Sequence, residues 1–160
     1  MAANQPDSKT RAILFLCLGN ICRSALAEGI LRDLAVTGGK EGLLTIDSAG
    51  TGGWHVGEAP DPRAISKAAE HGVDISGQRG RQVGRDDFDR FDLILAMDRS
   101  NLETLRARAP GTHRAELHQF MVYTQGRNED VPDPYYGGPE GFETVYRMLK
   151  KGCLALLDDL

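Results

Sequence analysis

An uninterrupted apolar run, AILFLCL at residues 12–18, constrains the fold of this chain more than any other feature. Runs of this length between polar and glycine residues are typical of strands buried on both faces, as in parallel sheets. The run ends in a turn at Gly19 and Asn20, and residues 24–36 then place apolar side chains at helical spacing. The first part of the chain therefore predicts a strand, a tight turn and a helix, with Ser24 suited to the start of that helix.

Later segments repeat this alternation of strands and helices. Three further strands are predicted at residues 43–48, 92–97 and 115–120. Helices are predicted at residues 62–72, 98–111 and 142–160, with at most a short helix at 86–91, and long loops at 49–62 and 121–141. Strands that alternate with helices favour an α/β domain with a parallel sheet. Ligands of such sheets bind beyond the carboxyl ends of the strands at the switch point, where residues 17–24 fall.

Composition and charge exclude several classes of protein. The 160 residues suit one domain, predicted at 11–160 after a flexible polar tail at 1–10. With 19 basic and 23 acidic residues the net charge is −4, which argues against nucleic-acid binding. Three scattered cysteines do not make a secreted disulfide scaffold, so reduced thiols and a cytoplasmic location are predicted. No signal peptide is recognisable and no apolar run is long enough for a membrane.

Cys17 and Arg23 stand six positions apart across the glycine turn, in the pattern C-x5-R. Five intervening residues are enough to wrap a tetrahedral anion with their backbone N–H groups, because Gly19 and Asn20 tolerate a positive φ. The following helix directs its positive end at the same point, and an arginine fork matches two phosphate oxygens. The same positive field favours the thiolate form of Cys17, and Ser24 is placed to donate a hydrogen bond to it. The segment therefore predicts a phosphate-binding loop with a nucleophile at its floor.

Two plainer interpretations of these cysteines stay open from spacing alone. A cysteine at the end of a strand is often a core residue. Cys17 and Cys22 also have a spacing that zinc ligands can take, although the four histidines are dispersed and no second close pair of ligands accompanies them. The strand, glycine turn and helix around Cys17 favour phosphate chemistry over both.

The second long loop offers the acid that such chemistry needs. Cleavage of an aryl phosphate expels a phenoxide, and a positioned proton donor makes that step much faster. Asp133 stands between two prolines that restrict the backbone, although a plain Pro-Asp-Pro turn would look the same. Tyr135 and Tyr136 follow, and Trp54 lies on the other long loop. These rings are candidates for the walls of a slot that holds a flat ring, or for simple packing of the loops.

Taken together, the motifs CLGNICRS, DSAGT, WHVG, PDPRA, FDLILAMD, DPYYGG and FETVY resemble those of the low-molecular-weight protein tyrosine phosphatases over nearly the whole chain. The resemblance implies a four-stranded parallel sheet with helices on both faces and the phosphate-binding loop between the first strand and the first helix. It implies hydrolysis of phosphotyrosine and aryl phosphate monoesters through a cysteinyl-phosphate intermediate, with no metal and no cofactor.

The resemblance also assigns residues to roles. Cys17 is the implied nucleophile, Arg23 the phosphate ligand and Asp133 the general acid and base. Cys22 is the implied redox partner, which would protect the nucleophile by forming a disulfide with it. The other implied members are the loop residues Leu18, Gly19, Asn20, Ile21, Cys22 and Ser24, the loop supports Ser48, His71 and Asp98, and the cleft residues Trp54, Tyr135 and Tyr136.

Rival activities are disfavoured by particular residues. Arsenate reductases of this fold need two further cysteines after the third strand, and residues 84–110 contain none. Ile21 stands where an aliphatic residue goes with phosphotyrosine and a threonine with phosphoarginine. A silent phosphotyrosine reader would lose Cys17 or Asp133.

The sequence departs from the family pattern at one position of the loop, and it leaves the protein substrate open. Ala25 replaces the proline usual in the family, so a slightly looser loop with retained activity is expected. The expected partner is a phosphotyrosine protein, with a tyrosine kinase, a polysaccharide-export protein and a host protein all open. Inorganic phosphate is the expected product, and the chain is expected to be a monomer that binds neither nucleic acid nor membrane.

Overall fold

The computed structural model describes residues 10–160, so the tail predicted at 1–10 lies outside the described residues except for Thr10. The strands are β1 (Arg11–Cys17), β2 (Leu44–Gly50), β3 (Leu93–Ala96) and β4 (Glu116–Gln119). The helices are α2 (Arg23–Thr37), α3 (Pro62–Glu70), α4 (Asp87–Arg90), α5 (Arg99–Arg108), α6 (Phe120–Gln125) and α7 (Pro139–Asp158). Short 3-10 turns occur at η2 (Glu41–Leu43) and η3 (Pro134–Tyr136).

The four strands form one parallel sheet in the order β2-β1-β3-β4. Cys17 at the end of β1 is in register with Gly50 at the end of β2, and Leu16 with Ala96 at the end of β3. The chain passes from β1 to β2 on one side and then returns to β3 on the other, which makes the carboxyl end of β1 the switch point of the sheet. The functional loop begins there.

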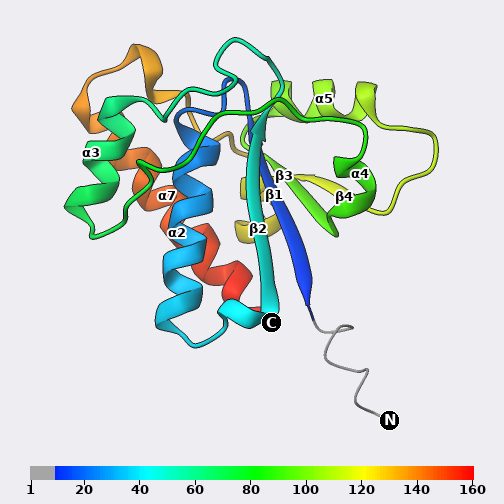
Figure 1. The fold of residues 1–160 in the computed structure, drawn as a ribbon, viewed down its shortest axis with the longest axis horizontal. Coiled ribbons are helices and arrows are strands. Elements are labelled where there is room, and N and C mark those ends of the chain that lie inside the picture. Colours follow the sequence, from blue (N-terminus) through cyan, green and yellow to red (C-terminus); the bar gives the residue numbers. More distant parts are fainter. Residues whose placement is uncertain (1–9) are drawn as a thin grey trace.

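Helices cover both faces of the sheet. Figure 1 shows α2, α3 and α7 on one side and α4 and α5 on the other. Alternate residues of β1 serve the two sides: Phe15 packs in the core beneath α2 and α7, and Leu14 packs in the core beneath α4 and α5. This alternation explains why β1 is apolar throughout, and the α/β architecture predicted from the sequence is confirmed.

Two local predictions were wrong. The loop predicted at residues 121–141 contains α6 and η3, and α7 begins at Pro139 rather than at residue 142. Phe120 and Met121 of α6 are buried, so tertiary packing makes a helix of a segment too short for a clear helical pattern. Ser24 lies in the first turn of α2, which begins at Arg23, in agreement with the predicted start of this helix, and its hydroxyl lies against Cys17.

The terminal helix behaves as its pattern predicts. The apolar residues at 142, 145, 149, 153 and 156 are all buried, against α2 and the sheet. Within residues 10–160, no helix is both long enough and apolar enough to cross a bilayer.

Candidate active site

The loop that follows β1 turns its carbonyl groups outward. The carbonyl oxygens of Cys17 and Leu18 accept hydrogen bonds from Thr51 and Gly52, and that of Ile21 accepts from Asp61, each at 2.9 Å. The C=O and N–H of one peptide unit point in opposite directions, so the next amide N–H after each of these carbonyls points to the inside of the loop. The loop is therefore lined with donors, as an anion-binding nest requires.

Cys17 lies at the floor of this nest and its sulfur receives two polar contacts. The backbone N–H of Asn20 donates to Sγ at 3.3 Å, and the Ser24 hydroxyl lies 3.0 Å from it. Cys17 is only 2% exposed, yet it lines the pocket described below. The arrangement stabilises a negative sulfur and presents it in one direction.

Asn20 holds the loop in its strained shape. Its φ of 60° lies in the left-handed region, where asparagine is better tolerated than most residues. Its side chain donates to Ser24 at 2.7 Å and to Ser48 at 3.0 Å, and accepts from the Arg81 backbone N–H at 3.0 Å. Gly50 allows the close approach of β2, because a Cβ there would come within 2.8 Å of the Leu18 carbonyl oxygen.

Arg23 is 2% exposed and is fixed at one end. Its Nη1 donates to Asp98 Oδ2 at 2.7 Å and to the Val131 carbonyl at 3.0 Å. Burial alone would lower its pKa, but the charges of Cys17 and Asp98 and the hydrogen bond to Asp98 outweigh burial and raise that pKa. Asp98 also accepts from the Asn101 N–H at the start of α5, so the carboxylate that holds Arg23 is itself held.

Asp133 reaches the site from a third segment. Its Oδ2 lies 3.7 Å from Arg23 Nη2, and its Oδ1 accepts from the Tyr135 N–H at 3.0 Å. The side chain is 34% exposed. The carboxylate therefore lies near the Arg23 guanidinium while remaining open to solvent.

These segments enclose a pocket of about 280 Å³. Its lining combines the phosphate-binding loop with residues 54 and 55 of the loop after β2 and with Asp133 and Tyr135 of the segment before α7. Trp54 is 68% exposed and its ring packs over Gly52, where any Cβ would collide with it. Tyr135 is 40% exposed, with the Arg63 guanidinium 5.2 Å from the centre of its ring. Two partly exposed aromatic residues from segments far apart in the sequence thus line the same pocket.

Two residues of the site were missed in the sequence. His55 lines the pocket, packs over Gly19 and pairs through Nδ1 with Glu58 at 2.9 Å. Its place beside Trp54 in the WHVG motif was the available signal. Glu28 lies on α2, 7% exposed, and accepts a 2.5 Å hydrogen bond from Ser48. It looked like an ordinary polar position of a helix.

His71 does not support the loop in this structure, and that prediction was wrong. It follows the end of α3, stacks on Tyr146 with 4.0 Å between ring centres, and lies 3.5 Å from Glu143. Both partners belong to α7, so His71 joins two helices instead. Tyr136 lies in η3, and its side chain falls outside the described part of the structure.

The other two cysteines differ from Cys17 in their surroundings. Burial, followed by the negative charges of Asp61 and Cys17, raises the pKa of Cys22, so this thiol stays protonated although it lines the same pocket. Burial also raises the pKa of Cys153, which is enclosed within the core beside α2. No group of three His, Cys, Asp or Glu residues is arranged to hold a metal ion among residues 10–160.

A parallel α/β sheet that surrounds a buried thiol with inward-facing amides and a fixed arginine defines a class of proteins that bind a tetrahedral anion at a cysteine. The model of the family described as low molecular weight phosphotyrosine protein phosphatase matches residues 12–160. The chain belongs to this family, which confirms the resemblance seen in the sequence.

Relatives cover nearly the whole chain. The low molecular weight protein-tyrosine-phosphatase YfkJ of Bacillus subtilis is 44% identical over 147 residues, which are 91% of this chain and 93% of that protein. The low molecular weight phosphotyrosine protein phosphatase of Sus scrofa is 38% identical over 154 residues, 95% of this chain and 97% of that protein. The predicted class of enzyme, a protein tyrosine phosphatase, is thereby confirmed.

Solved structures agree with this assignment and add a second activity among the relatives. The crystal structure of Primo-1 has a TM-score of 0.87 and 40% identity, and the alignment covers 94% of this chain and 98% of that one. The crystal structure of DARP, a Drosophila arginine phosphatase, has a TM-score of 0.84 and 34% identity, with 92% and 96% covered.

Proposed function

We propose that this chain hydrolyses phosphotyrosine in proteins, with Cys17 as nucleophile, Arg23 as phosphate ligand and Asp133 as general acid and base. One observation carries the proposal: a sulfur that receives two polar contacts lies at the floor of a pocket whose mouth holds a carboxylate and two aromatic rings. A phosphoryl group at the floor would place the tyrosine ring between those aromatic walls.

In the first step the Cys17 thiolate attacks phosphorus and the bond to the tyrosine oxygen breaks. The loop amides and Arg23 hold the three remaining phosphate oxygens, where charge is spread in the transition state. Arg23 keeps Asp98 and Val131 as partners of Nη1, so its Nη2 is the group that turns to phosphate. Asp133, 3.7 Å from Nη2, would then lie beside the leaving oxygen and give it a proton.

In the second step water attacks the phosphorus of the cysteinyl-phosphate. Asp133, now ionised, accepts a proton from that water, and sulfur leaves as the thiolate. The Ser24 hydroxyl, 3.0 Å from Sγ, stabilises the departing sulfur. Inorganic phosphate is released and the starting state returns.

Hydrolysis of phosphoarginine is the second candidate, favoured by the arginine phosphatase among the similar structures. Ile21 is the residue that decides between the two in our proposal. It is 9% exposed and lines the pocket, where its aliphatic side chain suits an aromatic ring better than a charged guanidino group. Ile21→Thr should therefore raise the ratio of phosphoarginine to phosphotyrosine turnover.

Steady-state hydrolysis of a phosphotyrosine peptide, with reductant and without metal, tests the main proposal. Turnover by the wild type and its loss in Cys17→Ser are expected, while Cys153→Ala, which alters a buried thiol away from the pocket, should retain turnover. Binding of the peptide without turnover by the wild type would make the chain a phosphotyrosine reader. Turnover of phosphoarginine alone would keep the mechanism and refute the role given to Ile21.

The remaining parts of the proposal concern the setting of the enzyme. We place it in the cytoplasm, as a single-domain monomer that acts on a phosphotyrosine protein such as a tyrosine kinase. Cys22 lines the same pocket as Cys17, and both are free thiols in this structure. A disulfide between them under oxidation would block the pocket reversibly.

A further inference from the structure

A buried chain of hydrogen bonds runs from Glu28 on α2 to the sulfur of Cys17. Ser48 Oγ lies 2.5 Å from Glu28 Oε1, and Asn20 Nδ2 lies 3.0 Å from Ser48 Oγ. Asn20 Nδ2 also lies 2.7 Å from Ser24 Oγ, which lies 3.0 Å from Sγ. All five residues are at most 7% exposed, so solvent supplies none of the missing partners.

The direction of this chain is fixed at the Glu28 end. A carboxylate accepts hydrogen bonds and donates none. Glu28 Oε2 accepts from Arg32 Nη1 at 2.7 Å, so the second oxygen of this carboxylate is an acceptor as well. Ser48 must therefore give its single hydrogen to Oε1, which leaves its oxygen to accept from Asn20.

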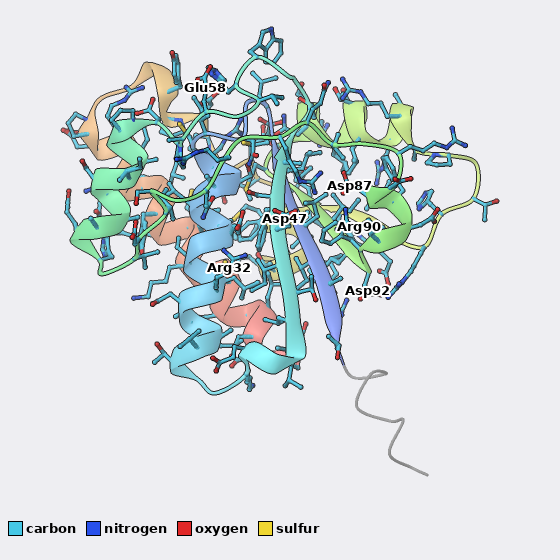
Figure 2. All side chains as sticks on the ribbon, in the orientation of Figure 1. Arg32, Asp47, Glu58, Asp87, Arg90 and Asp92 are labelled. Atoms are coloured by element: carbon cyan, nitrogen blue, oxygen red, sulfur yellow. The ribbon has the colours of Figure 1, made fainter. Side chains whose placement is uncertain are left out.

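The orientation of the Asn20 amide is fixed independently. Asn20 Oδ1 accepts from the Arg81 backbone N–H at 3.0 Å, and a backbone N–H cannot accept in return. Arg81 is held by Asp87, at 2.9 and 3.0 Å, and by Asp47 at 3.1 Å. Figure 2 labels both carboxylates, Asp47 on β2 and Asp87 on α4, together with Arg32 on α2. The amide cannot flip, so both hydrogens of Nδ2 face Ser48 and Ser24.

Ser24 is thereby left with one arrangement. Its oxygen accepts from Asn20, and its hydrogen points to the sulfur of Cys17. We infer that Glu28 is a positioning residue of the reaction: by accepting from Ser48 it leaves the Ser48 oxygen free to accept from Asn20, and this hydrogen bond holds the Asn20 amide where it donates to Ser24 and so makes Ser24 a donor to the Cys17 thiolate. This inference rests on the proposed function, because it assumes that Cys17 is the nucleophile.

Glu28→Gln tests the direction without changing the shape of the side chain. Arg32 is a donor, so the new amide oxygen turns to Arg32 and the new NH₂ group turns to Ser48. Ser48 then faces two donors, and its own hydrogen has no acceptor. The Asn20 side chain is pushed from its place and Ser24 loses its constraint, because the Arg81 N–H still forbids a flip.

The first readout is the rate at which iodoacetate alkylates Cys17 at about pH 6, corrected with Cys17→Ser. The second is kcat on a phosphotyrosine peptide. Glu28→Gln should lower both by about tenfold, with KM changed less, because the lost interaction acts on the sulfur. Glu70→Gln, which changes a surface carboxylate that pairs with Lys67, is the matched control and should leave both readouts unchanged.

A double-mutant cycle separates this role from a merely structural one. Ser48→Ala interrupts the same chain, so adding Glu28→Gln to it should lower the alkylation rate less than twofold further. Additive effects, or an alkylation rate in Glu28→Gln equal to that of the wild type, would overturn the inference. If Glu28→Gln does not fold, Ser48→Ala alone must lower the alkylation rate.

The proposed function can fail separately. Alkylation that responds to Glu28→Gln in a protein that does not turn over phosphotyrosine would keep the positioning role and refute the substrate. If the wild type turns over phosphotyrosine but Glu28→Gln leaves the alkylation rate unchanged, the proposed function stands and the positioning role is refuted.

Discussion

The two segments that supply the candidate catalytic groups are built in opposite ways. The polar side chains of the phosphate-binding loop are buried: Asn20, Arg23 and Ser24 are at most 3% exposed, and they bond to one another, to Ser48 of β2 and to Asp98, which caps α5. The segment with Asp133 is anchored at Val131, whose N–H donates to the Met97 carbonyl oxygen at 2.9 Å, and the next two residues, Pro132 and Asp133, are exposed. The proposed nucleophile is thus held within a buried network of hydrogen bonds, whereas the proposed acid is open to solvent.

Arg23 joins these two segments, so changing it should have the largest effect. Arg23→Lys keeps the charge but cannot hold Asp98, the Val131 carbonyl and phosphate together. We expect kcat/KM on a phosphotyrosine peptide to fall by about 10³-fold, as when a preorganised donor to the transition state is lost. Arg79→Lys, an exposed arginine bonded to backbone carbonyls, is the control and should change nothing. A loss below tenfold would show that a point charge suffices.

Substitutions of Asn20 test how much the stability of the phosphate-binding loop depends on the side chain and on the positive φ at this position. Asn20→Gly removes three hydrogen bonds but accepts the positive φ, and the free energy of unfolding should fall by about 2 kcal/mol. Asn20→Ala adds the strain of the left-handed region, for a fall of about 3 kcal/mol. Urea denaturation measures both. Equal losses in the two variants would mean that the loop relaxes its φ when the side chain is lost.

The phosphate-binding loop was also easier to predict from the sequence than the segment with Asp133. The apolar run, the glycine turn and the spacing of Cys17 and Arg23 all act over short stretches of chain, where local rules hold. Four strands and the residues of the phosphate-binding loop followed from such patterns. The place of Glu28 in the site did not, because it depends on a hydrogen bond from Ser48, which lies 20 residues away on β2.

Errors concentrated where distant packing decides the outcome. The six residues of α6 are helical because Phe120 and Met121 enter the core, which their own pattern does not reveal. His71 was placed at the loop by resemblance alone. In the structure its ring stacks on Tyr146, so a contact across two helices determines its position. Asp98 was placed with the loop on the same grounds, and here Arg23 does reach it.

Substitution of Asp133 tests the contribution of the exposed segment that carries it. Asp133→Asn removes the proton donor while keeping a similar shape, so kcat should fall by about 10²-fold for a phosphotyrosine peptide. An aryl phosphate with a good leaving group should lose much less, because its oxygen needs no proton to depart. Glu129→Gln, which changes an exposed carboxylate four residues earlier, is the matched control. Equal losses for both substrates would assign Asp133 to binding rather than to proton transfer.

The smallest expected effect concerns Glu143, whose hydrogen bonds join α7 to α3. Glu143 near the start of α7 accepts from Lys67 of α3 and from Arg147, and these hydrogen bonds lower its pKa from 4.5 to about 2. Because the pKa of Glu143 is lower in the folded protein than in the unfolded chain, its ionised form stabilises the fold at pH values above about 4.5. This stabilisation is lost as the pH falls from about 4.5 to about 2. Because the Glu143 side chain is 27% exposed and solvent screens its charge, the change should be small. Thermal midpoints measured across this range should fall less steeply in Glu143→Gln than in the wild type, and Glu140→Gln should follow the wild type. A slope unchanged by Glu143→Gln would show that α7 is held to α3 by its apolar face alone, through Phe142, Val145 and Tyr146.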